Sequence, residues 1–174
     1  TNYIDGDEID ANNFYTDGTS DLQVYLDVKK VKNCKFENIA VLPYVENGDY
    51  MTKFDDCKFT NCEIVSKSNI TDKTRKTILK RCELENSILK GMYSSSDTAK
   101  GSIILDDCDI NLPTKINVIY SQSNSTTGAH LYKILNSRIS ISSPLKNFVG
   151  LSSSGVVNQF ELQLKNIEIK YKRW

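Results

Sequence analysis

The stretch VKNCKFENI, residues 31–39, decides the fold because its pattern returns along the chain. It reappears as FDDCKFTNC at residues 54–62 and as LKRCELENS at residues 79–87. Shorter copies, LDDCDI, ILNSRI and LKNIEI, begin at residues 105, 134 and 164. The cysteine or its equivalent stands at positions 34, 57, 82, 108, 137 and 167, in steps of 23 to 30 residues. A period of roughly 20 to 50 residues is typical of stacked repeat architectures.

Within each copy, apolar and polar residues alternate, which indicates strands rather than helices. Cys34 and Phe36 share one face of such a strand, but Val31 precedes Cys34 by three residues. Val31 and Cys34 can both point inward only if the chain bends at Asn33, a residue type that tolerates the left-handed conformation. Asp or Asn stands at the equivalent positions 56, 107, 136 and 166, and Arg81 is the exception.

A second step of three residues, from Phe36 to Ile39, predicts a second bend at Asn38. Each unit therefore contains three strands and two bends, followed by a variable loop. This plan predicts an all-β fold, a right-handed parallel β-helix of about six coils that stack at ~4.8 Å. The inward positions then form three columns: Val31, Phe54, Leu79, Leu105, Ile134 and Leu164; Cys34, Cys57, Cys82, Cys108, Ser137 and Ile167; and Phe36, Phe59, Leu84, Ile110, Ile139 and Ile169.

The Asn-Cys-x-Phe-x-Asn phrase resembles the coil repeat of the pectate-lyase-like β-helix superfamily, over roughly residues 22–171. That fold carries lyases, hydrolases, adhesins and phage tail spikes, so the resemblance concerns architecture more than activity. The segment IDGDEIDAN, residues 4–12, also looks like phrases that precede the receptor-binding parts of phage tail proteins.

These resemblances imply a structural and host-receptor domain of a phage tail fibre, spike or appendage, located in the virion and assembled in the host cytoplasm. They further imply a host surface glycan as partner and a homo-oligomer, a trimer. Two alternatives stay open: a polysaccharide lyase or hydrolase of the β-helix class, and a bacterial surface adhesin with an extracellular location.

Composition narrows the function classes. The 174 residues suffice for one domain with a core, and 22 basic residues balance 22 acidic ones. With a net charge of zero, the chain lacks the excess of basic residues that is typical of nucleic-acid-binding proteins. No apolar run approaches the ~18 residues of a membrane span. We expect residues 22–174 to form the β-helix, with an alternating first strand at residues 22–28. Residues 1–21 are expected to be an N-terminal cap or linker, and the start at Thr1 is expected of a fragment or a processed chain.

The five cysteines do not have the spacing of a metal site. Cys34, Cys57, Cys82 and Cys108 fall in one column, one per coil, which spreads them over ~14 Å at ~4.8 Å per coil, whereas zinc needs four ligands around a point. Parallel side chains on neighbouring strands also suit disulfide geometry poorly. We therefore expect buried, reduced thiols that serve as small apolar core residues, and no metal or cofactor.

Paired carboxylates occur at Asp55-Asp56 and Asp106-Asp107, with Lys80 and Arg81 at the matching positions between them. Alternating sign at stacked positions predicts a cross-strand charge ladder, and acid–base catalysis by these pairs is the alternative. The Gly-His-Gly signature of related polygalacturonases is absent from the sequence. We expect no catalytic residues, and the chain is interpreted as a binding protein rather than an enzyme.

The variable connections, residues 43–50, 66–76, 93–101, 121–130 and 151–158, all follow the third strand and should stack along one side. A basic group within them, at positions 73, 75 and 76, is interpreted as a solvated loop. Carbohydrate sites pair an aromatic face with groups that hydrogen-bond hydroxyls. The candidate glycan site on this side consists of Tyr93, Asp97, Tyr120, Asn124 and His130.

Overall fold

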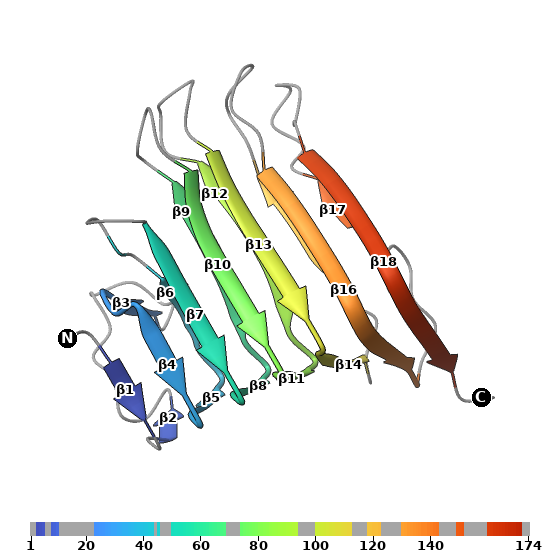
Figure 1. Ribbon diagram of the computed structural model, residues 1–174, viewed down its shortest axis with the longest axis horizontal. Helices are drawn as coiled ribbons and strands as arrows, with labels where there is room; N and C mark the ends of the chain where they lie inside the picture. The colour runs from blue at the N-terminus through green and yellow to red at the C-terminus, as the bar shows by residue number, and fades with distance from the viewer. Residues whose placement is uncertain are drawn as a thin grey trace.

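The computed structural model describes residues 3–5, 8–10, 23–43, 45, 50–68, 74–93, 100–112, 118–122, 130–142, 149–151 and 160–171. Within these ranges the chain is built of parallel strands that stack along one axis as a β-solenoid, which confirms the predicted parallel β-helix (Figure 1). Among the described residues, no helix has the length and apolar character that crossing a membrane requires.

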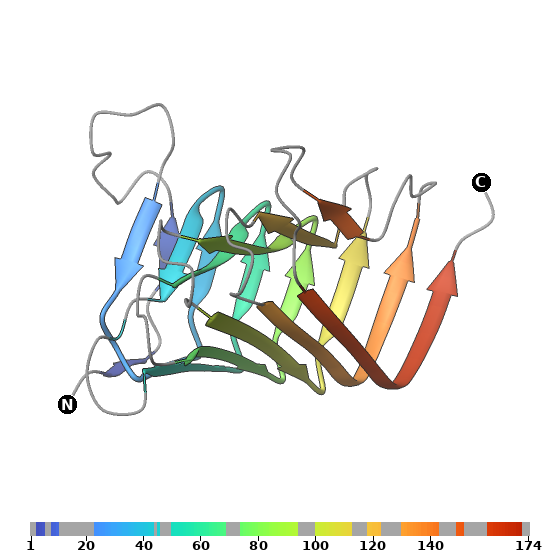
Figure 2. The same cartoon turned by 90° about the horizontal axis from the view of Figure 1, so that it is seen from above.

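Each coil contributes strands to two sheets (Figure 2). First strands are β1 (Tyr3–Asp5), β4 (Lys30–Lys32), β7 (Met51–Asp55), β10 (Thr74–Lys80) and β13 (Lys100–Asp106). Second strands are β2 (Glu8–Asp10), β5 (Lys35–Glu37), β8 (Lys58–Thr60), β11 (Glu83–Glu85) and β14 (Asp109–Leu112). In the last two coils one long strand covers both positions, β16 (His130–Ile141) and then β18 (Phe160–Tyr171).

Third strands form a separate six-stranded sheet. They are β3 (Gln23–Leu26), β6 (Ala40–Pro43), β9 (Glu63–Ser68), β12 (Ile88–Tyr93), β15 (Ile119–Gln122) and β17 (Val149–Leu151). The described strand ends place the variable connections between third and first strands, as predicted. Several connections are shorter than expected, and the difference is largest at the second, because β9 extends to Ser68 and β10 begins at Thr74.

The register of the strands confirms the predicted columns. Val31 pairs with Phe54, Phe54 with Leu79, and the series continues through Leu105, Ile134 and Leu164. The phenylalanines give the first coils a dense core: the rings of Phe36 and Phe59 stack with centroids 4.9 Å apart, and Phe54 meets both rings edge-on. Such ring pairs contribute about 0.5–1.5 kcal/mol beyond their buried area.

Both predicted bends are left-handed. At the first bend φ lies between 51° and 56° at positions 33, 56, 81, 107, 136 and 166, and at the second it is 50° to 54° at positions 38, 61 and 86. Arg81, the expected exception, adopts the same conformation at φ 51°. The bend amides also stack: Asn61 Nδ2 donates to Asn38 Oδ1 at 3.3 Å, and Asn86 Nδ2 donates to Asn61 Oδ1 at 2.6 Å.

The N-terminal part differs from the expectation in one respect. The strand expected to open the first coil is formed as β3, but it pairs with β6 and is therefore a third strand. β1 and β2 pair in parallel with β4 and β5, which puts Ile4 beside Val31 and Ile9 beside Phe36. The three strands β1 to β3 thus occupy the positions of a coil ahead of Val31, and the number of coils differs slightly from six.

Candidate functional site

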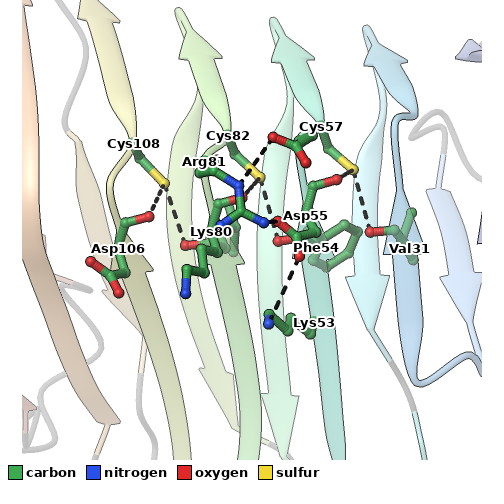
Figure 3. Close-up of polar contacts among 12 residues, drawn as sticks. Val31, Lys53, Phe54, Asp55, Cys57, Lys80, Arg81, Cys82, Asp106 and Cys108 are labelled. Atoms are coloured by element: carbon green, nitrogen blue, oxygen red, sulfur yellow. Dashed lines mark hydrogen bonds and ion pairs between the residues drawn. The ribbon is translucent and has the colours of Figure 1, made fainter.

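The thiol column lies just inside the first bend, where the side chain turns into the core. All five cysteines are buried and free of disulfide bonds, as predicted. Cys57, Cys82 and Cys108 each lie near two backbone carbonyls: Sγ of Cys82 is 3.4 Å from the oxygen of Lys80 and 3.6 Å from that of Phe54 (Figure 3). A thiol carries one proton, which these two acceptors share. The column is therefore a set of small internal donors rather than an open reactive site.

Ionisation is suppressed at Cys62 and Cys82, whereas hydrogen bonds with Cys82 lower the pKa of Cys57 and of Cys108. Desolvation raises the pKa of Cys62, which lies after the second bend, to about 11. Hydrogen bonds with Cys108 and Cys57, together with burial, raise the pKa of Cys82. Because the thiolate is the nucleophile and the metal ligand, thiols held neutral in this way are chemically inert at neutral pH.

The predicted charge ladder is present in register, with Lys32, Asp55, Lys80 and Asp106 opposite one another on successive first strands. The closest ion pairs, however, are made by arginines, some between directly opposed residues and some diagonally. Arg81 contacts Asp55 of the preceding coil (Figure 3), and Nε of Arg81 also lies 3.3 Å from Oδ1 of Asp56.

Asp107 pairs in the other direction, with the following coil. Its Oδ1 lies 3.0 Å from Nη1 of Arg138, and Arg138 also contacts Asp109. Hydrogen bonds to Asp109 and Asp107 raise the pKa of Arg138. These groups line a charged corner of about 380 Å³ in which the acidic side chains lie against arginines. A carboxylate engaged by a guanidinium acts as a fixed acceptor, so this corner suits cohesion between coils.

A different pocket, here called the Tyr171 pocket, opens where the second strands end. Its volume is about 480 Å³. Two adjacent columns line it: Glu85, Asn111, Ser140 and Lys170 form the polar one, and Leu112, Ile141 and Tyr171 form the apolar one. Ser142 completes the lining. The pocket therefore extends over four successive coils.

The Tyr171 pocket combines an aromatic side chain with a row of hydrogen-bonding groups. Tyr171 is 72% exposed, so most of its aromatic side chain faces solvent. Glu85 accepts hydrogen bonds, Lys170 donates them, and the Asn111 amide and Ser140 hydroxyl do both. Lys170 Nζ also lies 3.3 Å from Oε1 of Glu168 on the same strand, and this ion pair partly neutralises the charge of Lys170.

The sequence did not single out the Tyr171 pocket, although a signal exists. Residues one position after the third predicted column are Glu85, Asn111, Ser140 and Lys170, and extending the columns by one and two positions would have found both walls of the pocket. Polar residues directly after an apolar column are typical of ordinary surface, so their residue types alone do not indicate a pocket wall.

The residues of the predicted glycan site are only partly described. Tyr93 ends β12, Tyr120 lies in β15, and His130 begins β16 in the other sheet. Tyr120 pairs with Lys90, three positions before Tyr93, so the two tyrosine backbones are offset by ~10 Å along the strands at ~3.3 Å per residue. Asp97 and Asn124 lie outside the described residues. This site stays a prediction.

The basic group near the second connection needs a correction. Arg75 was interpreted as part of a solvated loop, but it lies on β10 and is 1% exposed. Its Nη1 donates to the Val45 carbonyl oxygen at 3.0 Å, which ties β10 to the segment after β6. Lys76 is exposed as expected, and position 73 lies outside the described residues.

Comparison of the chain with protein-family models, curated proteins and solved structures found no match. The geometry above is therefore the ground for any functional conclusion.

Proposed function

We propose that this chain is a structural and host-glycan-binding β-helix domain of a phage tail fibre, spike or appendage. The observation that carries the proposal is the Tyr171 pocket, in which an exposed aromatic side chain adjoins a row of hydrogen-bonding groups over four coils. Successive coils are ~4.8 Å apart, so the row can contact consecutive parts of one extended saccharide.

The rest of the described structure supports a rod-like scaffold. The core columns run through successive coils, and bonds between coils recur at the bends and at the charged corner. A rigid scaffold that presents a preformed site avoids part of the entropy cost of ordering on binding. Self-association through one outer face, as a trimer, belongs to the same proposal, as does a location in the virion.

The test is binding to a glycan array and adsorption to host cells. Tyr171→Ala should lower binding by at least about tenfold, since loss of a stacked aromatic hot spot commonly costs 1.4 kcal/mol or more. Tyr25→Ala is the matched control, because Tyr25 is also an exposed tyrosine, at 52%, but lies on β3 in the other sheet.

A Tyr93→Ala, Tyr120→Ala double variant tests the connection side in the same assay. Loss of binding there, with Tyr171→Ala unaffected, would move the receptor site to that side. Equal binding by all variants would show that neither the Tyr171 pocket nor the connection side is the receptor site. Release of product from a host polysaccharide would establish the enzyme alternative instead.

A further inference from the structure

The C-terminal coil leaves the core columns open. Within the described residues, β18 pairs with β16 on one side and with no strand on the other. Leu164 is 50% and Ile169 58% exposed, whereas Ile134 and Ile139, one coil earlier in the same columns, are 0% and 1% exposed. A strand of 12 residues with a free edge and exposed apolar side chains is a template for strand addition.

Within the described residues, the N-terminal coil also has a strand edge that pairs with no other strand. β1 and β2 end the order of the twelve-stranded sheet, and their residues Ile4 and Ile9 stand in register with Val31 and Phe36. Leu164 and Ile169 are the last members of these two columns. A second copy placed after β18 therefore brings Ile4 to Leu164 and Ile9 to Ile169, with the spacing of five residues kept at both ends.

The charges of the two ends also fit. Asp5 belongs to the series that ends at Lys165, and Asp10 belongs to the series that ends at Lys170. Stacking a second copy pairs each of these carboxylates with a lysine at directly opposed positions, an arrangement that stabilises neighbouring strands. The remaining pair sets Glu8 opposite Glu168, whose charge is offset by Lys170 at 3.3 Å.

We propose that copies of this chain associate head to tail, with β1 and β2 of one copy adding in parallel to the free edge of β18 of the next. The contact is heterologous, because different surfaces of the two copies meet. Stacking without closure extends the solenoid into a filament whose length depends on concentration. This surface is separate from any lateral face used for a trimer, but it shares Lys170 with the Tyr171 pocket, so its test reads association and not glycan binding.

Charge reversal at the two ends tests the proposal. The first variant is Lys165→Glu with Lys170→Glu, and the second is Asp5→Lys with Asp10→Lys. Each alone opposes like charges at the junction, and a mixture of the two restores opposite charges at every junction. The control, Lys30→Glu with Lys76→Glu, reverses two exposed lysines on β4 and β10, away from the junction.

Light scattering and sedimentation velocity over increasing concentration give the readout. The wild type and the control should rise to at least about twice the mean mass of either end variant, and the equimolar mixture should recover that mass. Circular dichroism and protection of the thiols from labelling verify that each variant folds. If the Asp5 and Asp10 variant loses structure in its N-terminal coil, the Lys165 and Lys170 variant alone decides the test. A wild type that stays at 19.7 kDa, end variants that associate like wild type, or a mixture that fails to recover overturns the proposal.

Discussion

Replacing Cys82 tests whether the position after the first bend needs a hydrogen-bond donor and not merely a small apolar group. Cys82 is 2% exposed, and its thiol lies near two backbone carbonyls. Ser137 occupies the equivalent position in a later coil, where its Oγ donates to the Leu135 carbonyl at 2.7 Å and accepts from the Cys108 amide at 3.1 Å. A serine at position 82 therefore finds the same partners.

The expected magnitudes separate two variants. Cys82→Ala removes a group of methylene size, which costs about 0.8 kcal/mol in lost burial, and a hydrogen bond that contributes about 0.5–1.5 kcal/mol. The sum is about 1.5–2 kcal/mol of unfolding free energy, and incomplete closure of the cavity adds to it. Cys82→Ser loses a similar burial but gains a shorter O–H···O bond, so we expect a loss of about 1 kcal/mol or less.

Thermal and urea unfolding followed by circular dichroism measure the difference. In a chain of this size 1 kcal/mol shifts Tm by about 2–4 °C, so Cys82→Ala should fall by about 3–8 °C and Cys82→Ser by less. The reverse exchange, Ser137→Cys, is the matched control and should be tolerated, because cysteine already serves this role in four coils. An alanine variant as stable as the serine variant would refute the requirement for a donor.

Two further predictions concern titration and salt. Because the pKa of Cys62 is raised from 9.0 to about 11, the unfolded thiol ionises first, and unfolding free energy should fall by about 2.7 kcal/mol in total as the pH rises from well below 9 to well above 11, at 1.36 kcal/mol per unit; Cys62→Ser, which does not ionise there, should lack this part of the loss, and equal pH profiles would contradict the assignment. Arg81→Asp should lower the urea midpoint, because it replaces contacts to Asp55 and Asp56 with repulsion, and the loss should shrink in high salt; a loss independent of salt would show that the ion pairs are not its cause.

The core and the bends could be predicted from sequence because their causes are local. Alternation fixes which side chains face inward, and a step of three residues requires a bend wherever two inward residues flank it. Val31, Cys34 and Phe36 thus determine one coil, and repetition of their spacing determines the stack. No long-range information was needed beyond the period.

The N-terminal coil was not found, although its spacing is the same. Ile4 and Ile9 are five residues apart, as are Val31 and Phe36. Residues 4–10 carry four acidic residues and no cysteine, so residues 1–21 look like a polar cap or linker in the sequence. The phase of β3 was then assigned from its own alternation, which identifies a strand but not its partner.

Contacts between coils were harder to predict than the columns. Arg75 donates to an acceptor 30 residues away, at Val45, and a basic residue near a connection gives no local sign of such burial. The Tyr171 pocket has the same origin, since Glu85 and Tyr171 meet only through the register of the intervening strands. A site formed by residues of several coils can be predicted only when the strand register is known, and the residue types can then be compared at the matched positions.

Arg81 shows how far stacking overrides local preference. Arginine lacks the short side chain that lets Asn and Asp bond to their own backbone in the left-handed region, yet Arg81 has φ 51° like its neighbours in the column. Its amide donates to the Asp106 carbonyl at 3.0 Å, and the amide of Asp56 donates to the Lys80 carbonyl at 3.1 Å. Both bonds require the bend to match the coils on either side. The hydrogen bonds from the coils on both sides therefore hold the bend in the left-handed conformation, even with an unfavourable residue type. A terminal coil has only one such neighbour. A residue that disfavours the left-handed conformation should therefore be tolerated least at the bends of the terminal coils.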